Sequence, residues 1–363
     1  MNTSLKKIVW LLHEPLISGA NIAALEYAQQ LRNAYAIHFI LPHTGILESV
    51  LKEKKFDFTI IPQYNWAGTA RKGLNRVRYW LRTKMAVAQT KKLIKDVKAN
   101  IVFTNTIVPF TASVAASTIG LPHVWWVHEF GEEDFGFSIG NGNNQMAYRQ
   151  MQKSKLVICN SKAVCKKYQS VLHRADVRTL YQPVSSKQVP GSVQRNDTFL
   201  MFGQITPSKG HLEVLQALAF NKEQGKHVAK LNIKGPCENK YYFHQLLSFV
   251  KKHQLENYVS VEEGFFNNDE TIAACKALIV ASSAEAFGRV IMEAVKANVK
   301  VIVKNSGGAP ELINDSNGIL YHSFNELTDI LAGDIALPTV QSTSVYDERS
   351  EINKLKNWLL QIQ

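Results

Sequence analysis

The sequence predicts an α/β protein with two doubly wound parallel sheets. Short apolar runs alternate with helical patterns along the chain, which is typical of βαβ units. The 363 residues, of which 45% are hydrophobic, suffice for two ordinary domains. A cluster of Pro, Gly and Ser within 182–196 indicates a boundary. We therefore expect domains at 1–183 and 184–345, followed by a C-terminal segment at 346–363.

The elements of the first half follow from apolar runs and helical periodicity. The predicted strands are 7–12, 38–41, 58–61, 100–104, 124–128 and 156–160. The predicted helices are 22–33, 46–54, 75–98, 108–119 and 162–173. The glycine-rich stretch 131–144 between them is predicted to be a loop, either a lid or binding element or irregular surface.

The second half repeats this alternation without a visible sequence repeat. Its predicted strands are 198–202, 229–234, 258–261, 277–281 and 299–303. A short amphipathic helix is expected at 350–360, because Ile352, Leu355 and Leu359 share one face. Ser350 is its predicted N-cap.

The segment 277–294 carries the most information about function. An apolar run at 277–281 is followed by a polar turn with Glu285, and a helix then carries Glu293. Both carboxylates can face the crevice at the strand's carboxyl end, where open α/β sheets bind ligands. Carboxylates accept hydrogen bonds from sugar and ribose hydroxyls, and the amides of residues 286–288 suit a phosphate. The alternative is that Glu285 only caps the helix and Glu293 lies on a solvated face.

A second strand, 299–303, precedes another polar turn with the sequence NSGGAPE at 305–311. Gly307 and Gly308 let the backbone approach a ligand closely, and residues 306–308 offer N–H groups to an anion. Glu311 lies near the start of the following helix. The two consecutive strand–turn–helix units together predict a nucleotide-sugar site.

These segments resemble the retaining GT-B glycosyltransferases of family 4, the glycosyl transferases group 1 type. The resemblance rests on EAFGRVIME at 285–293, GGAPE at 307–311 and FGQITPSKG at 202–210. It implies two Rossmann-like domains that face a central cleft, with the C-terminal helix crossing back to the first domain. It also implies transfer of a sugar from a nucleoside diphosphate to an acceptor hydroxyl with retention. The basic first half of the chain indicates a glycan or lipid-linked acceptor, in bacterial cell-envelope or surface glycan assembly.

The resemblance also assigns expected roles. Lys209 would stabilise the leaving diphosphate, Glu285 would contact the sugar and Glu293 the ribose. The expected catalytic residues are Glu285, His128 and Lys209. The expected donor-binding residues are Gly19, Gln204, Lys209, Ala286, Phe287, Gly288, Glu293, Gly307 and Gly308. No cofactor or metal is expected.

Gln204 departs from the family pattern, which carries an arginine at that position. The amide still donates hydrogen bonds but supplies no charge, so either donor binding is weaker or Arg289 or Lys234 compensates. A catalytically silent partner subunit of another transferase is the main alternative. A GT-B epimerase or phosphorylase lacks its expected signature here, and an oxidoreductase is disfavoured because no Gly-x-Gly-x-x-Gly follows the first strand.

In the first half, a turn and a strand end contribute candidate residues. Gly19 lies in the turn between the first strand and helix, where it suits an anion or simply makes a tight turn. His128 can hydrogen-bond the donor sugar or be a buried, satisfied histidine, and Glu129 can contact the acceptor. Asn160-Ser161 closes the next strand and opens a helix, and it is interpreted first as a cap and second as a ligand contact.

The positive charge is concentrated in the first half of the chain. The formal net charge is +12, and residues 1–183 hold 24 Lys/Arg against 11 Asp/Glu. Residues 71–98 contain ten basic side chains and one acid, with apolar residues at helical spacing. Such a helix suits an anionic membrane surface, or it packs on the core with a solvated outer face. No DNA or RNA motif accompanies the charge, so no nucleic-acid partner is expected.

The remaining composition bears on the cellular location. The apolar run after Lys6 and Lys7 is stopped by His13–Pro15, which is too soon for a signal peptide. No run reaches the ~18 apolar residues of a membrane-spanning helix. The four cysteines show no metal-binding spacing, which favours reduced thiols. We therefore expect a cytoplasmic protein that is peripheral on the inner face of the cell membrane if 71–98 binds lipid.

Overall fold

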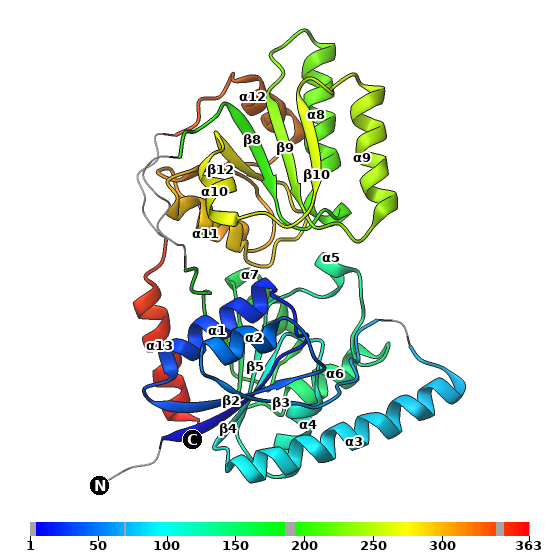
Figure 1. The fold of residues 1–363 in the computed structure, drawn as a ribbon, viewed down its shortest axis with the longest axis vertical. Coiled ribbons are helices and arrows are strands. Elements are labelled where there is room, and N and C mark those ends of the chain that lie inside the picture. The colour runs from blue at the N-terminus through cyan, green and yellow to red at the C-terminus, as the bar shows by residue number, and fades with distance from the viewer. Residues whose placement is uncertain (1–4, 69, 186–192, 339–344, 363) are drawn as a thin grey trace. The chain divides into compact units, whose positions relative to one another are not determined.

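The computed structural model describes residues 5–68, 70–185, 193–338 and 345–362 (Figure 1). The chain divides into two compact units, Met1–Pro183 with Asp347–Gln363, and Val184–Tyr346. Residues 186–192 of the predicted boundary lie outside the described part of the chain. Each unit holds one sheet in which all recorded strand pairs are parallel, so the predicted pair of parallel α/β sheets is confirmed.

The first sheet has seven strands in the order β3-β2-β1-β4-β5-β6-β7. Their bounds are β1 Lys6–Leu11, β2 Tyr35–Leu41, β3 Asp57–Ile60, β4 Ile101–Asn105, β5 His123–Val127, β6 Leu156–Cys159 and β7 Val177–Thr179. The chain first winds outward from β1 to β3 and then returns to the other side of β1. The strand order therefore reverses between β1 and β4, which is the point where such sheets bind ligands.

Helices cover both faces of this sheet. They are α1 Gly19–Leu31, α2 Leu47–Glu53, α3 Gly73–Val97, α4 Thr111–Thr118, α5 Glu132–Phe135, α6 Asn144–Met151, α7 Lys162–Val171 and α13 Glu348–Gln361. Successive side chains of a β-strand point to opposite faces of the sheet, so β1 contributes side chains to both faces. Ile8 and Trp10 pack with α1, α2 and α13, whereas Val9 and Leu11 pack with α3 and α4.

The C-terminal helix α13 completes the core of the first unit. Leu355 and Leu359 are fully buried in the same cluster as Trp10 and Trp126. The predicted cap Ser350 is wrong: Asp347 is the N-cap, and its carboxylate accepts from the amides of Arg349 and Ser350. A carboxylate at this position also interacts favourably with the helix dipole.

The second sheet has six strands in the order β10-β9-β8-β11-β12-β13. The bounds are β8 Thr198–Phe202, β9 Lys230–Gly235, β10 Val259–Glu263, β11 Ala277–Val280, β12 Lys300–Lys304 and β13 Gly318–Tyr321. The helices are η1 Pro207–Lys209, α8 His211–Glu223, α9 Lys240–Lys252, α10 Asn268–Ala273, α11 Arg289–Lys296, η2 Ala309–Leu312 and α12 Phe324–Ala332. Its order reverses between β8 and β11. None of the described helices in either unit is both long enough and apolar enough to cross a bilayer.

Several short elements differ from the sequence prediction. Strands β7 and β13 have three and four residues and were not predicted. The predicted loop 131–144 contains α5 and meets the start of α6. Short elements give too few repeats of a period to be recognised, and their pairing in the sheet or capping by a carboxylate stabilises them instead.

Candidate active site

Three loops of the second unit meet at one edge of its sheet. They follow β8, β11 and β12, which are neighbours in the sheet and end on the same side. The backbone amide of Ser283 donates to the carbonyl of Ser208 at 3.0 Å, and the hydroxyl of Ser306 donates to the carbonyl of Ser283. These bonds join the loops at the point where the strand order reverses, which is the expected ligand position in an open α/β sheet.

Glu285 lies at the centre of these loops. Its Oε2 receives hydrogen bonds from Lys209 Nζ and from Ser282 Oγ, each at 2.8 Å. The Glu285 side chain is 13% exposed and that of Lys209 is 39% exposed. Among the described residues nothing binds the other oxygen, Oε1. The carboxylate is thus oriented through one oxygen and keeps the second available.

The same contacts set the ionisation of Glu285. Burial acts to raise the pKa of this carboxyl group, but the positive charge of Lys209 and the hydrogen bonds from Lys209 and Ser282 outweigh it. The pKa of Glu285 therefore lies below its ordinary value, and the side chain is an anion at neutral pH. It can accept hydrogen bonds but has no proton to donate.

Glycines allow the loops to approach this closely. Gly307 has φ +65°, and a Cβ there would lie 2.3 Å from the carbonyl oxygen of Glu285. The amide of Gly308 donates to this same oxygen at 2.6 Å. Gly210 has φ +73°, and a Cβ there would lie 2.1 Å from the carbonyl oxygen of Ala281. Larger residues would separate the loops that hold Lys209 and Glu285.

The amides expected to bind phosphate are only partly available. Gly308 donates to Glu285, and the amide of Ser306 donates to the carbonyl of Lys304 at 2.7 Å. Within the described part of the chain the Gly307 amide has no such acceptor. Both Ala286 and Phe287 are buried, and Gly288, with φ +93°, is the N-cap of α11.

The remaining predicted donor residues surround this group. Glu293 lies on α11 and is half-buried, and Gln204 is exposed on the loop after β8. Lys234 is one candidate replacement for the missing arginine, but its ammonium pairs with Glu262 at 3.0 Å. Arg289 is the first residue of α11.

His128 lies in a buried polar network at the corresponding edge of the first sheet. The amide nitrogen of Gln182 donates to its Nδ1 at 2.8 Å, and its Nε2 contacts Asn105 Oδ1 at 2.8 Å. Because an amide nitrogen donates and an amide oxygen accepts, Nδ1 is the acceptor in the first contact and Nε2 is the donor in the second. Both ring nitrogens are engaged by protein groups, as expected for a buried, satisfied histidine.

This network extends to the loop after β1. The side-chain amide of Asn105 donates to the carbonyl of Ala20 at 3.1 Å, and that of Asn21 donates to the carbonyls of Glu14 and Leu16 at 2.9 Å. These bonds hold the loop in which Gly19 begins α1. Sequence reasoning assigned no such role to Asn21, Asn105 or Gln182. The available signals were that Asn21 lies in the turn after the first strand and that Asn105 follows the predicted strand 100–104.

Glu129 joins two loops of the first unit. One carboxylate oxygen accepts from the amide of Ile107 at 2.6 Å and the other from the amide of His128 at 2.8 Å. The residue is 5% exposed. Burial raises the pKa of Glu129 to about 7, against the lowering effect of these two bonds. Glu129 therefore fixes the backbone of the two loops by these hydrogen bonds and does not face solvent.

Within each unit, the structure brings some of the predicted residues together. In the second unit these are Lys209, Glu285, Gly307 and Gly308, joined by Ser282, which the sequence did not single out. In the first unit they are His128 and Glu129. The described residues contain no group of three or more His, Cys, Asp or Glu placed to hold a metal ion.

Comparisons with known proteins identify the relatives of both units. The family model described as Glycosyltransferase Family 4 matches residues 17–188, and that described as Glycosyl transferases group 1 matches residues 185–331. A search among curated proteins finds no match.

Solved structures share the fold over nearly the whole chain. HepE from Anabaena, in complex with UDP and glucose, is 19% identical with a TM-score of 0.77, covering 98% of this chain and 100% of that one. A glycosyltransferase from Rickettsia africae is 18% identical with a TM-score of 0.70, covering 98% and 94%. The lipopolysaccharide outer core galactosyltransferase WaaB is 15% identical with a TM-score of 0.71, covering 98% and 99%.

The two family models meet at the boundary between the two units and together span residues 17–331. The chain belongs to the glycosyltransferases of the group 1 and family 4 type, with the GT-B fold.

Proposed function

We propose that this glycosyltransferase moves a hexosyl group from a nucleoside diphosphate-sugar to an acceptor hydroxyl, with retention of the anomeric configuration. The observation that carries the proposal is the Lys209–Glu285–Ser282 group at the strand-order reversal of the second sheet. It combines a partly exposed cation with an oriented anion at the position where an open α/β sheet binds ligands.

Lys209 is proposed to stabilise the leaving group. When the bond between the anomeric carbon and the diphosphate oxygen breaks, negative charge accumulates on the diphosphate. The side chain of Lys209 is 39% exposed and therefore accessible to such an anion. It supplies positive charge that a metal ion supplies in other transferases, so we propose a reaction without a metal cofactor. Unchanged turnover after chelation by EDTA is the expected result, and loss of turnover that Mg²⁺ restores would contradict it.

Glu285 is proposed to bind the transferred sugar. Its pKa is lowered, so it accepts hydrogen bonds from hydroxyls, and Oε1 has no partner among the described residues. Glu293 on α11 is proposed to bind the ribose diol, and the Gly307 amide together with the start of α11 to bind phosphate.

Retention is proposed to follow from attack on the face that the diphosphate leaves. The acceptor oxygen bonds to the anomeric carbon, the bond to the diphosphate oxygen breaks, and the acceptor proton passes to a diphosphate oxygen. A double-displacement scheme needs a carboxylate nucleophile and an acid/base partner about 5 Å apart. Glu285, held through Oε2 by a cation, is assigned to hydroxyl binding instead. NMR of the product's anomeric proton tests this, and inversion would overturn it.

The first unit is proposed to bind the acceptor. His128 and Glu129 keep their proposed roles toward the sugar and the acceptor. Both side chains are engaged by protein partners, so substrate contact requires exchange of one of these hydrogen bonds.

Two relatives suggest the class of substrates. Solved structures of HepE contain UDP and UDP-glucose, and WaaB is a galactosyltransferase of the lipopolysaccharide outer core. We therefore propose a uridine diphosphate-sugar as the donor and a cell-envelope or surface glycan as the acceptor.

A thermal-shift experiment tests the donor site. The protein is heated with each common nucleoside diphosphate and nucleotide sugar, beside Glu293→Ala and, as a control, Glu256→Ala, an exposed acid elsewhere on the second unit. We expect uridine diphosphate to raise Tm, by about 2–4 °C at 100 times Kd or more, in the protein and the control but not in Glu293→Ala. No shift with any nucleotide would favour the silent partner subunit over the enzyme.

A further inference from the structure

Helix α3 of the first unit has two apolar faces. Its 25 residues extend over about 37 Å. The buried side chains Tyr79, Thr83, Ala86, Thr90 and Ile94 recur every three or four residues and face the rest of the unit. In Figure 1 the N-terminal part of α3 extends beyond the other helices of its unit. One face of α3 is thus fully occupied by packing.

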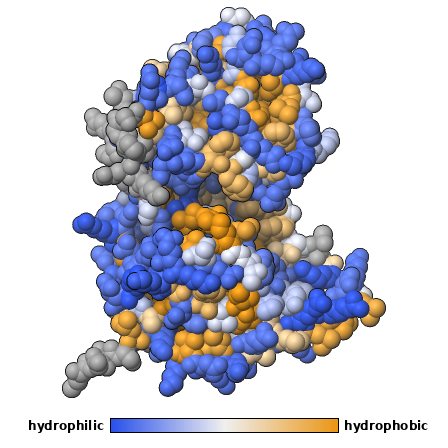
Figure 2. Space-filling view, viewed as in Figure 1, coloured by the Kyte–Doolittle hydropathy of each residue, from blue (hydrophilic) through white to orange (hydrophobic). Residues whose placement is uncertain are grey.

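The opposite face is apolar as well, yet exposed. Leu74, Val77, Leu81 and Met85 are 77%, 56%, 58% and 63% exposed. At 100° per residue their spacing places them on one side of the helix, away from the buried residues. Figure 2 shows hydrophobic surface among hydrophilic surface over the N-terminal part of α3. A solvated outer face would be polar here, so these four residues, the apolar stripe, require another explanation.

Basic side chains flank the apolar stripe and continue past it. Residues 71–98 contain ten Lys and Arg and one acid. Arg71 and Arg82 lie over the rings of Tyr79 and Tyr64, at 4.3 and 5.9 Å from the ring centres. Among the described residues no carboxylate pairs with any basic side chain of α3. The part of the chain that the structure describes therefore leaves the charge of this surface without a neutralising carboxylate.

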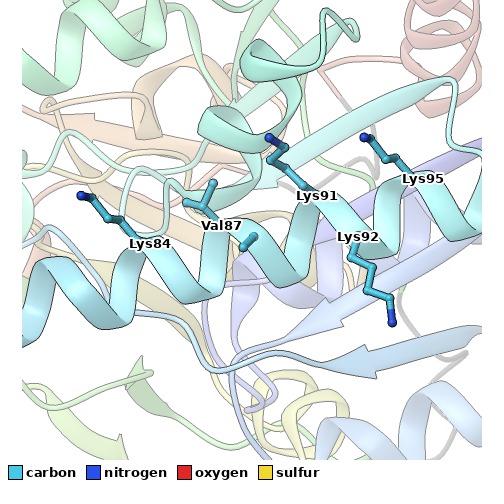
Figure 3. Close-up of a pocket in the computed structure, with 6 residues that line it drawn as sticks. Lys84, Val87, Lys91, Lys92 and Lys95 are labelled. Carbon is cyan, nitrogen blue, oxygen red and sulfur yellow. The ribbon is translucent and has the colours of Figure 1, made fainter.

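A shallow hollow of about 470 Å³ lies farther along the same helix, lined by Lys84, Val87, Ala88, Lys91, Lys92 and Lys95. In Figure 3 the ammonium groups of Lys84, Lys91 and Lys95 point to one side of the helix and that of Lys92 to the other. Apolar side chains and lysine stems form its floor, and the ammonium groups of three of its four lysines lie on one side of the helix (Figure 3). This arrangement suits phosphate groups attached to hydrocarbon.

We propose that the outer face of α3, made of the apolar stripe and the lysines of this hollow, docks the enzyme on an anionic phospholipid bilayer. The stripe would enter the acyl boundary, and the basic side chains would contact lipid phosphates, as in helices that lie in a membrane interface. Pairing with α3 of a second copy is disfavoured, because it would oppose two sets of unneutralised cations. This inference does not rest on the proposed donor or acceptor.

Flotation with vesicles tests the docking. The whole protein is mixed at low salt with phosphatidylcholine vesicles that contain or lack phosphatidylglycerol. We expect binding to the anionic vesicles, little binding to the neutral ones, and release at high salt. Equal binding to both kinds of vesicle, or none at low salt, would overturn the proposal.

Two variants separate the contributions of charge and apolar contact. Replacing Lys91, Lys92 and Lys95 with Ala should weaken vesicle binding about fivefold for each lysine. Leu81→Ser with Met85→Ser should weaken it by about tenfold or more. The matched controls change exposed residues elsewhere: Lys251→Ala with Lys252→Ala on α9, and Leu360→Ser on α13. They should bind as the unchanged protein does.

Two further measurements test other binding partners for the outer face of α3. The variants should keep the Tm and the nucleotide-induced shift of the unchanged protein, because the altered residues lie outside the proposed site. Sedimentation should show no change of oligomeric state in Leu81→Ser with Met85→Ser. A dimer that this variant dissociates, or tighter binding to single-stranded RNA than to the anionic vesicles, would overturn the proposal.

Discussion

Glu285 and Glu129 each follow an inner strand of a parallel sheet, yet their surroundings shift their pKa values in opposite directions. The pKa of Glu285 is lowered, because Lys209 and Ser282 outweigh the effect of burial. The pKa of Glu129 is raised to about 7, because burial outweighs two backbone hydrogen bonds. Among the residues that the structure describes, one oxygen of Glu285 has no partner, whereas both oxygens of Glu129 accept hydrogen bonds.

This difference in pKa corresponds to two roles of a carboxylate that follows an inner strand. A carboxylate beside a partly exposed cation remains ionised and accessible, which suits a ligand that carries hydroxyls and phosphate. A carboxylate bound only to backbone amides holds loops together at an electrostatic cost. The residue type and its place after a strand are therefore insufficient to distinguish them, and the neighbouring cation decides.

The largest expected effect tests whether Lys209 acts in chemistry. Lys209→Ala should lower kcat by about 10²–10³-fold, because the diphosphate loses its cation as charge develops. Lys276→Ala is the matched control, since Lys276 is 38% exposed and also pairs with one carboxylate, Asp197. The measurement is product formation with the donor found by thermal shift. Equal losses in the two variants would show that Lys209 has no special role.

The next largest expected effect concerns stability and tests the close approach of the loops that follow β11 and β12. Gly307→Ala should destabilise the protein by about 3 kcal/mol, from a positive φ and a Cβ placed against the Glu285 carbonyl. Gly333→Ala has φ +86° but no atom within 4 Å of its Cβ, so it should cost about 1 kcal/mol. Urea unfolding of both variants measures the difference. Equal costs would mean that the loops separate easily.

The pH dependence of stability tests the other carboxylate. The pKa of Glu129 is about 7 in the folded protein against an ordinary 4.5, so between these values the folded state holds a proton that the unfolded state has lost. The unfolding free energy should therefore fall as pH rises from 4.5 to 7, by up to about 3 kcal/mol. Urea unfolding at several pH values measures the slope.

Glu129→Gln isolates this contribution. The glutamine side chain does not titrate, and its amide group faces a backbone donor. We therefore expect a loss of unfolding free energy that is the same at every pH, without the fall between pH 4.5 and 7. Burial lowers the pKa of His123 to about 3, which makes stability rise with pH between 3 and 6.5 in both proteins. The difference between the two curves therefore reports Glu129 alone. Parallel curves would contradict the raised pKa.

The smallest expected effect concerns the charge missing at Gln204. Gln204→Arg should tighten nucleoside diphosphate binding by about three- to tenfold, because an exposed arginine adds one charge-assisted contact. Calorimetric titration measures Kd, and the gain should shrink as salt is added. Unchanged affinity would mean that another cation already serves this position.

The sequence predicted the long, strongly periodic elements well. Both parallel sheets were expected from runs of apolar residues, and β8 was predicted with its observed bounds. The strands β7 and β13 were missed, since three or four residues show no period and depend on their neighbours in the sheet. Asp347 replaced Ser350 as the cap because several polar residues precede α13 and geometry selects among them.

The candidate site was predictable where several residues form a motif. Lys209, Glu285 and the glycines at 307 and 308 lie in three motif segments, and the structure brings them together. Ser282, Asn105 and Gln182 belong to no motif, because their partners are distant in sequence and their roles appear only when strand ends meet. Likewise, periodicity identified α3 as amphipathic, but only packing shows which of its two apolar faces stays exposed.

The contribution of α13 to the first unit has a consequence for biosynthesis. Leu355 and Leu359 complete a core whose other members include Ile8, Trp10 and Trp126. During translation the whole of the second unit leaves the ribosome before these two leucines do. The hydrophobic cluster of the nascent first unit is therefore incomplete while the second unit is synthesised. In this interval the first unit is exposed to aggregation and to binding by chaperones. The first unit therefore depends, for its complete core, on residues that are synthesised after the whole of the second unit.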